Sequence, residues 1–343
     1  MSKTLIPGYP YDRTELRRQL GVVDRAPGSA KPDPILVVDN IVRRFGGLTA
    51  VDVDHLEVQR GAITALIGPN GAGKTTFFNL ITGFDKPSSA PGLLRRSAEG
   101  TANWVFDGRP MANTGAYRVA RSGMVRTFQL TKALSRMTVL QNMLVGAKDQ
   151  RGENLFVGLF SPLWSQREKE NTEKALSLLE RFKLYDKRDD LAGELSGGQR
   201  KLLEMARALM SDPLMIMLDE PMAGVNPALT QSLLDHIIAL RDEGTTVLFV
   251  EHDMHMVRHI SDWVVVMAQG SIIAEGLPQT VMQDQSVIDA YLGAHHDTDL
   301  GDDSVLDTDF IETIEAAVEA EAGGGAGAGG GGGADESARG ATP

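Results

Sequence analysis

The chain has 343 residues, 42% of them hydrophobic, so it can bury the core of one large domain or two modest ones. Its formal charge is -12, but twelve acids and one base follow residue 296, which leaves 34 acids and 33 bases before it. This balance argues against an overall basic field for nucleic acid, and the absence of cysteine excludes disulfides and thiolate metal sites and suits a reducing compartment.

The first 33 residues mix charged side chains with prolines, and they predict a polar extension with one short helix near Arg13 to Leu20. They lack the apolar stretch of a signal peptide. All apolar runs in the chain are far shorter than the roughly 20 residues that a membrane helix needs. We therefore expect neither secretion by that route nor a helix that spans a bilayer.

Strand patterns dominate the next segment. Residues 35–38 are an apolar run, residues 42–45 are strand-like, and residues 51–58 alternate between apolar and polar, which predicts an antiparallel sheet. Phe45 stands at a strand end before two glycines. It is either a ring on which a nucleotide base stacks or an ordinary core residue, and the sequence leaves both interpretations open.

A glycine-rich loop follows a buried strand over Ala62–Ile67 and precedes a helix over Thr75–Ile81. It matches the pattern G-x-x-x-x-G-K-[ST], in which backbone amides surround phosphates while a lysine and a hydroxyl reach phosphate and magnesium. The helix N-terminus faces the same anion. The residues of this predicted nucleotide site are Gly68, Pro69, Asn70, Gly71, Ala72, Gly73, Lys74, Thr75 and Thr76.

Helical patterns fill the middle of the chain. A strand over residues 125–129 ends in the neutral amide of Gln129, and residues 139–145 and 168–184 predict a helical subdomain over about 130–212. Ser196, Gly197, Gly198 and Gln199 then open a helix over residues 200–210. This start is either an ordinary N-cap or a second nest of amides that faces phosphate.

Two further buried strands end in polar residues. The strand over residues 214–218 leads into Asp219 and Glu220, where open α/β sheets bind their ligands. Because neighbouring strand residues point in opposite directions, we assign Asp219 to magnesium and Glu220 to the attacking water. The strand over 246–250 leads to His252, which either contacts a γ-phosphate or is structural. Residues 263–275 predict a closing hairpin around Gly270.

The composition changes after Gly293. Residues 294–343 are first acidic and then almost wholly glycine and alanine, which favours a solvated, disordered tail. An acidic docking helix is the alternative, because Phe310, Ile311, Ile314 and Val318 recur at helical spacing.

Residues 34–293 carry the phosphate loop, Gln129, Leu-Ser-Gly-Gly-Gln at 195–199, Asp219-Glu220 and His252 in one order that resembles the ATP-binding-cassette (ABC) ATPases. This resemblance implies an α/β fold of the P-loop NTPase class: a RecA-like core with an antiparallel β subdomain and a helical subdomain. It also implies a head-to-tail pair of cassettes, formed by two copies or by two different chains. Each ATP then lies between one phosphate loop and the other chain's Ser196–Gln199.

The resemblance implies roles for the matching residues. Lys74 holds phosphate, and Thr75, Gln129 and Asp219 surround Mg2+. Glu220 activates water, His252 contacts the γ-phosphate, and Gln129 reports its presence to a membrane subunit. The implied partners are transmembrane permease subunits, a second ABC ATPase and, indirectly, a solute-binding protein, with the chain peripheral on the cytoplasmic face of the membrane.

Within the family, residues 45–51, 125–129, 223–227 and 291–293 look like the ATPase subunits of branched-chain amino acid importers. Urea or other solute transporters are the alternative, as are a regulatory ATPase outside transport and a soluble cassette protein acting on ribosomes or DNA. The chain departs from the family at Ala223-Gly224-Val225-Asn226, where most cassettes have Ser-Ala-Leu-Asp, and in a longer loop at residues 87–103.

Overall fold

We describe residues 13–88, 103–112, 114–127, 134–148 and 162–296 of a computed structural model. They lie in the first of two units, 1–301 and 302–343, into which the chain divides. Gln129, the middle of the loop at 87–103 and the acidic and Gly/Ala-rich tail from residue 297 lie outside the described residues.

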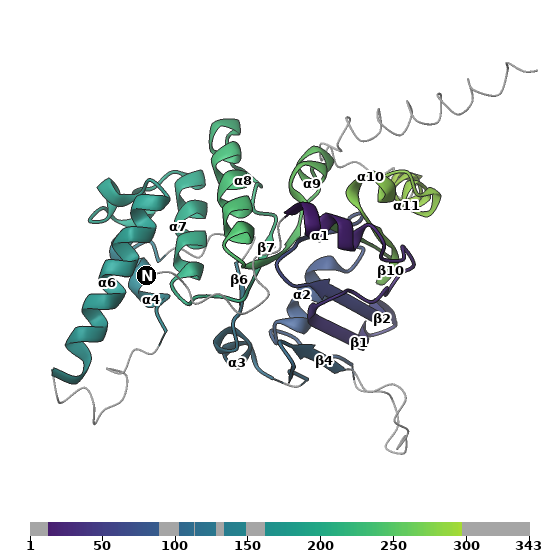
Figure 1. Ribbon diagram of the computed structural model, residues 1–343, viewed down its shortest axis with the longest axis horizontal. Helices are drawn as coiled ribbons and strands as arrows, with labels where there is room; N and C mark the ends of the chain where they lie inside the picture. Colours follow the sequence, from purple (N-terminus) through teal and green to yellow (C-terminus); the bar gives the residue numbers. More distant parts are fainter. Residues whose placement is uncertain (1–12, 89–102, 113, 128–133, 149–161, 297–343) are drawn as a thin grey trace, which may run out of the picture. The chain divides into compact units, whose positions relative to one another are not determined.

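A parallel sheet forms the centre of the described unit (Figure 1). Its strand order is β10-β9-β3-β8-β7-β6, with only the edge strand β10 antiparallel. Four strands, β3, β7, β8 and β9, are buried at every position, which explains why they are predominantly apolar runs in the sequence. The strands are β3 (Ile63–Ile67), β6 (Met124–Arg126), β7 (Met215–Asp219), β8 (Thr246–Val250), β9 (Trp263–Ala268) and β10 (Ser271–Gly276).

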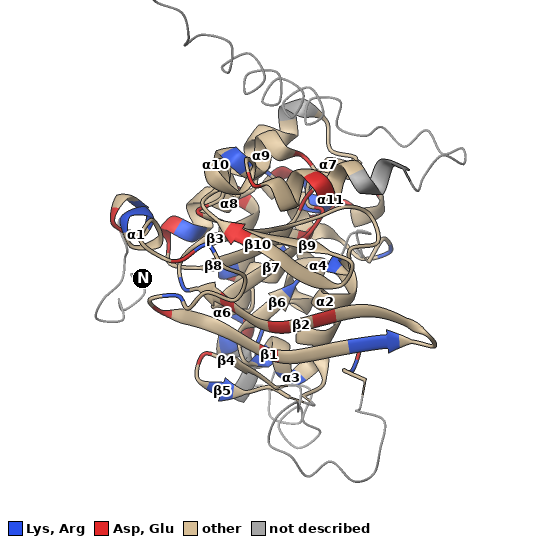
Figure 2. Ribbon diagram, turned by 90° about the vertical axis from the view of Figure 1, so that its right-hand side faces the viewer, with Lys and Arg blue, Asp and Glu red and all other residues tan. Residues whose placement is uncertain are grey.

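The second sheet is antiparallel, as the alternating pattern of its sequence predicts, with strand order β2-β1-β4-β5. Figure 2 shows β1 and β2 side by side, with a basic segment at the end of β1 that Arg43 and Arg44 form. The backbone N–H of Asp52 donates to the carbonyl of Gly270, which ties β2 to the hairpin of the other sheet. The strands are β1 (Pro34–Phe45), β2 (Leu48–Gln59), β4 (Asn103–Phe106) and β5 (Arg109–Pro110).

Helices α4, α6 and α7 gather on the side of the unit away from β1, β2 and β4 (Figure 1), and α4 contacts both of the others. They form the helical subdomain that the sequence predicts. The helices are α2 (Lys74–Ile81), α3 (Ala116–Arg121), α4 (Val139–Val145), α6 (Pro162–Arg181), α7 (Gly197–Leu209), α8 (Pro227–Asp242), α9 (Met254–Ile260), α10 (Pro278–Val281) and α11 (Gln285–His296), with 3-10 turns at Tyr185–Lys187 and Ala192–Glu194.

The N-terminal helix α1 (Arg13–Leu20) packs into the main hydrophobic core through Leu16 and Leu20. The Nε atoms of Arg13 and Arg17 lie 3.4 and 3.5 Å from Oδ1 of the fully buried Asp262. The segment between α1 and β1 is therefore anchored at both ends, by the packing of α1 before it and by the sheet that contains β1 after it. This helix occurs where the sequence predicts one, and its packing makes it part of the same unit as the sheets.

Candidate functional site

The phosphate loop joins β3 to α2 in the conformation that its glycines allow. Gly68 has φ +148°, and a Cβ there would lie 2.0 Å from the carbonyl oxygen of Met267 on β9. Gly73 has φ +98°, and a Cβ there would lie 2.3 Å from the carbonyl oxygen of Ala50. Both positions require glycine. The N-cap residue of α2 is Gly73, which has no side chain to cap the helix, so the amides of the first turn remain available to an anion.

Lys74 begins α2 and lies inside this loop. Its Nζ donates hydrogen bonds to the carbonyls of Gly68 at 2.6 Å and Pro69 at 3.0 Å. Burial lowers the pKa of Lys74 to about 8, against the opposing effect of the nearby carboxylates of Glu220 and Asp219. The loop, the lysine and the carboxylates at the end of β7 therefore form one site, while the side chain of Thr75 lies exposed next to them.

Asp219 ends β7 with its side chain only 2% exposed. Its Oδ2 accepts a hydrogen bond from Nη2 of Arg126 at 2.6 Å, and Arg126 also donates to Oδ1 of Asn79 on α2 at 2.6 Å. The other oxygen, Oδ1, is buried and has no hydrogen-bond partner among the described residues. A buried carboxylate oxygen that lacks a donor fits a cation ligand, and hard oxygen donors suit Mg2+.

Glu220 follows the strand in a left-handed conformation, with φ +48°. Glu220 lies after the end of β7, so the strand alternation from which we predicted opposite directions for Asp219 and Glu220 does not extend to it. Nε2 of His252 lies 2.8 Å from Oε1 of Glu220, and both side chains are partly exposed. The two residues thus form a hydrogen-bonded pair at adjacent strand ends, open to a substrate.

Three residues of this region had no role in the sequence-based prediction. Arg126 pairs with Asp219, and Lys201 of α7 donates through Nζ to the backbone carbonyl of Glu220 at 2.8 Å. Glu251 is buried, which raises its pKa, and it accepts from the backbone N–H of Met222 at 2.9 Å. No motif marks them, because each acts through a contact between elements distant in the sequence.

Ser196 caps α7 through a reciprocal pair of bonds. Its hydroxyl accepts from the backbone N–H of Gln199 at 3.2 Å, and Oε1 of Gln199 accepts from the N–H of Ser196 at 3.0 Å. Ser196 and Gly197 are exposed, while Gly198 is buried against Leu229. Among the described residues, no hydrogen bond or ion pair joins this segment to the phosphate loop. Its N-cap interpretation is confirmed, and its contact with phosphate stays a prediction.

Phe45 is 49% exposed at the end of β1, so it is not a core residue. The guanidinium of Arg43 lies 4.5 Å from the centroid of its ring. An exposed ring beside a cation leaves the stacking interpretation in place as a prediction. Gln129, the remaining site residue predicted from the sequence, lies outside the described residues.

This chain belongs to the ATP-binding cassette family: a family model described as ABC transporter matches residues 51–223. A second model, described as branched-chain amino acid ATP-binding cassette transporter, matches residues 271–297. The match confirms the resemblance, the fold class and the assignment as an ATPase. Among the described residues, no helix is both long enough and apolar enough to cross a membrane.

The curated relatives are similar over most of their length. A protein of Archaeoglobus fulgidus named probable branched-chain amino acid transport ATP-binding protein LivG is 42% identical over 260 residues, 76% of this chain and 96% of its own length. The high-affinity branched-chain amino acid transport ATP-binding protein BraF of Pseudomonas aeruginosa is 42% identical over 262 residues, 76% of this chain and 98% of its own length.

Solved structures of ATP-binding cassettes also match this chain, which confirms the fold class. An ATP-binding cassette of an ABC transporter in its ADP conformation matches with a TM-score of 0.63 and 40% identity, and covers 76% of this chain and 99% of its own. A nucleotide-free cassette matches with the same TM-score and 39% identity, and covers 75% of this chain and 98% of its own.

Proposed function

We propose that this chain is the ATPase subunit that powers import of branched-chain amino acids. The substrate class rests on the names of the relatives and on the C-terminal match at residues 271–297. One observation supports the ATPase mechanism most strongly. The phosphate loop, the Glu220–His252 pair and the carboxylate of Asp219, one of whose oxygens lacks a hydrogen-bond partner among the described residues, lie together at the carboxyl ends of neighbouring strands. Phosphoryl transfer needs mostly such positioning and charge stabilisation.

Each residue of the site has its own role in binding or hydrolysing ATP. The backbone amides of residues 71–76 and the side chain of Lys74 hold the phosphates of ATP, and the exposed ring of Phe45 stacks on its base. Thr75 and Asp219, with Gln129, hold Mg2+, which neutralises phosphate charge. Glu220 orients the attacking water and accepts its proton, and His252, 2.8 Å from Glu220, contacts the γ-phosphate.

A second cassette completes the site, either another copy or a related chain. Among the described residues, no hydrogen bond or ion pair joins Ser196–Gln199 to the chain's own phosphate loop, and we assign the start of α7, where Ser196 and Gly197 are exposed, to a partner's ATP. Since the paired state then binds ATP more tightly than separate cassettes do, ATP favours closure and hydrolysis releases it. The aspartate that most cassettes carry is replaced by Asn226, whose side chain caps α8.

The surface that we assign to contact with the permease subunits lies on the helical subdomain. Leu134, Met137 and Leu191 are each about 40% exposed, and backbone bonds link their segments: the N–H of Met137 donates to Leu134 and that of Ala192 to Met137. Two residues of this apolar patch, Leu134 and Met137, follow Gln129 closely in the chain. We assign it to the cytoplasmic loops of the permease subunits, a contact that would hold the chain at the cytoplasmic face of the membrane.

The test is co-expression with candidate permease subunits and a solute-binding protein, followed by reconstitution into liposomes. The proposal predicts Mg-ATP hydrolysis and uptake of labelled leucine that depends on ATP. Uptake of urea instead would correct the solute alone, and ATPase activity with no permease bound would overturn the transport role.

A further inference from the structure

The backbone of Glu220 is held in an uncommon conformation. A residue other than glycine with φ +48° persists only where its surroundings fix it. Its N–H donates to the carbonyl of Val250 on β8 at 3.0 Å. Its carbonyl accepts from Nζ of Lys201 at 2.8 Å and, more weakly, from the N–H of Ala223 in the same loop at 3.2 Å. Both polar backbone groups of the predicted catalytic base are thus hydrogen-bonded, and Lys201 supplies the bond that comes from α7.

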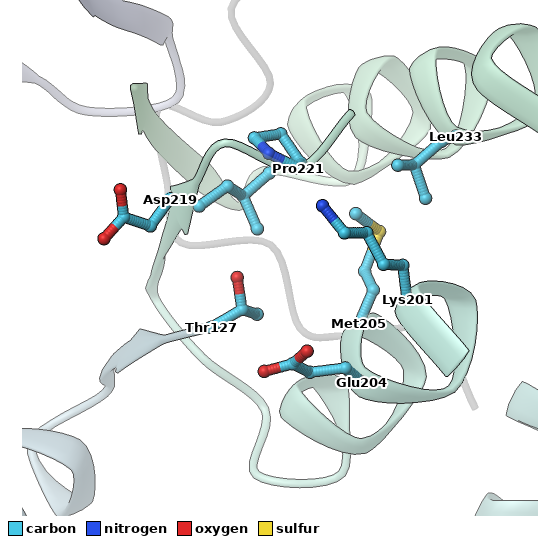
Figure 3. Close-up of a pocket in the computed structure, with 8 residues that line it drawn as sticks. Thr127, Lys201, Glu204, Met205, Asp219, Pro221 and Leu233 are labelled. Atoms are coloured by element: carbon cyan, nitrogen blue, oxygen red, sulfur yellow. The ribbon is translucent and has the colours of Figure 1, made fainter. Parts of the chain in front are cut away.

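Lys201 lies five positions after Ser196, on the first turns of α7. In Figure 3 its side chain extends from the helix toward Pro221, in a small pocket that Glu204, Thr127 and Asp219 also line. Burial lowers the pKa of Lys201, and Glu251 and Glu204 are the first of the carboxylates that oppose this effect. The ammonium therefore stands between the start of α7 and the end of β7, where it has carboxylate neighbours.

The loop after Glu220 has a second attachment. Oε1 of Glu251 accepts from the N–H of Met222 at 2.9 Å, and Oε2 accepts from the N–H of His252 at 3.2 Å. The segment 220–222 is fixed to β8 on one side and to α7 on the other. Glu251 and His252 follow β8 directly, so these bonds attach the loop to the end of β8. The Lys201 bond is the attachment that links the loop to the helix after Ser196.

We propose that Lys201 is a positioning residue for hydrolysis: by holding the carbonyl of Glu220 it directs the Glu220 carboxylate, and it makes that direction depend on the position of α7. The proposal rests on the proposed function, in which Glu220 activates water and the start of α7 contacts the partner's ATP. Nucleotide binding does not involve Lys201, because the phosphate loop is made by other elements.

The test compares Lys201→Met, Lys201→Arg and the control Lys169→Met, which removes a lysine 77% exposed on α6. Lys201→Met is expected to lower kcat about ten- to hundredfold, the effect of small misplacements, with KM for ATP unchanged within twofold. Lys201→Arg, which keeps a charged donor, restores most of kcat, and Lys169→Met matches the wild type. If Lys201→Met does not fold, Lys201→Gln, shorter and uncharged, must show the same loss.

A double-mutant cycle separates positioning from a merely structural role. In the Glu220→Gln background, Lys201→Met is expected to change residual single-turnover hydrolysis by less than about twofold, because its effect passes through the missing carboxylate. A further loss of the same size as in the wild-type background would overturn the proposal, as would near-normal kcat in Lys201→Met. An inactive wild-type protein with its partners would instead contradict the proposed function.

Discussion

Glu220 bears the chemical step in this account, since its carboxylate is hydrogen-bonded to His252 at the edge of the nucleotide site. Glu220→Gln keeps the size of the side chain and removes the basic oxygen. We expect it to bind ATP normally and to lose turnover by about a hundredfold or more, the contribution of a general base. Single-turnover hydrolysis and equilibrium ATP binding measure the two effects, and hydrolysis near the wild-type rate would remove the base assignment.

Lys74 gives ATP binding a dependence on pH, because burial lowers its pKa to about 8 in the free protein. Below pH 8 the lysine already carries the charge that phosphate needs. Above pH 8 binding must also take up a proton, so ATP affinity falls as pH rises, by up to about tenfold per pH unit. Calorimetry in magnesium-free buffer from pH 7 to 9 measures this dependence.

Lys74→Met is the control for that titration, because methionine is uncharged at every pH. Its affinity for ATP should be weak and nearly constant across the same range. A constant affinity in the wild type would show that Lys74 stays charged throughout and that its burial has little effect on its charge.

At this scale the sequence predicts the residues that stand in a motif and misses those that act through tertiary contacts. Lys74, Asp219 and His252 are recognisable because spacing and strand ends place them. Arg126 and Lys201 are 93 and 19 positions away from the residues they hold. Only the pairing of β6 with β7 and the packing of α7 bring them to the site.

The N-terminal extension contributes buried contacts to the fold that its polar composition does not predict. Lys31 and Glu275 form an ion pair at 3.0 Å with both side chains fully buried, and Nε1 of Trp263 donates to the same carboxylate at 2.9 Å. Lys31→Met leaves a buried negative charge without its cation, so we expect it to lower the free energy of unfolding by about 3–5 kcal/mol. Urea denaturation of the full chain measures this loss.

Arg18→Met serves as the matched control, because Arg18 pairs with Glu15 on the exposed side of α1. Solvent screens an exposed pair and leaves it little effect on stability, so this variant should unfold near the wild-type midpoint. Equal midpoints for Lys31→Met and Arg18→Met would mean that the buried pair does not anchor the extension.

The order of strands and helices in residues 34–293 follows from periodicity, since buried parallel strands are short apolar runs and the antiparallel strands alternate. The packing of α1 does not follow, because only two of its eight residues, Leu16 and Leu20, are buried. Two apolar positions are enough to predict a helix, but they do not show which part of the protein the helix packs against. The conformation of Glu220 was also missed, since no local pattern marks a positive φ there.

For the whole molecule, the central claim is that ATP joins two cassettes, with the phosphate loop of one facing Ser196–Gln199 of the other. A single cassette offers the phosphate loop, Asp219 and Glu220, but among the described residues no hydrogen bond or ion pair joins the start of its α7 to that loop. The acidity of residues 297–343 leaves residues 1–296 nearly neutral, so general charge repulsion between two cassettes is small.

The most direct test is the mass of the Glu220→Gln chain in analytical ultracentrifugation, alone and mixed with any second ATPase that copurifies with its permease. The account predicts that ATP converts single cassettes into a two-cassette particle in at least one of these samples. It also predicts that Ser196→Arg abolishes the particle while each chain still binds ATP. Single cassettes that remain separate in both samples, with ATP bound, would contradict the account.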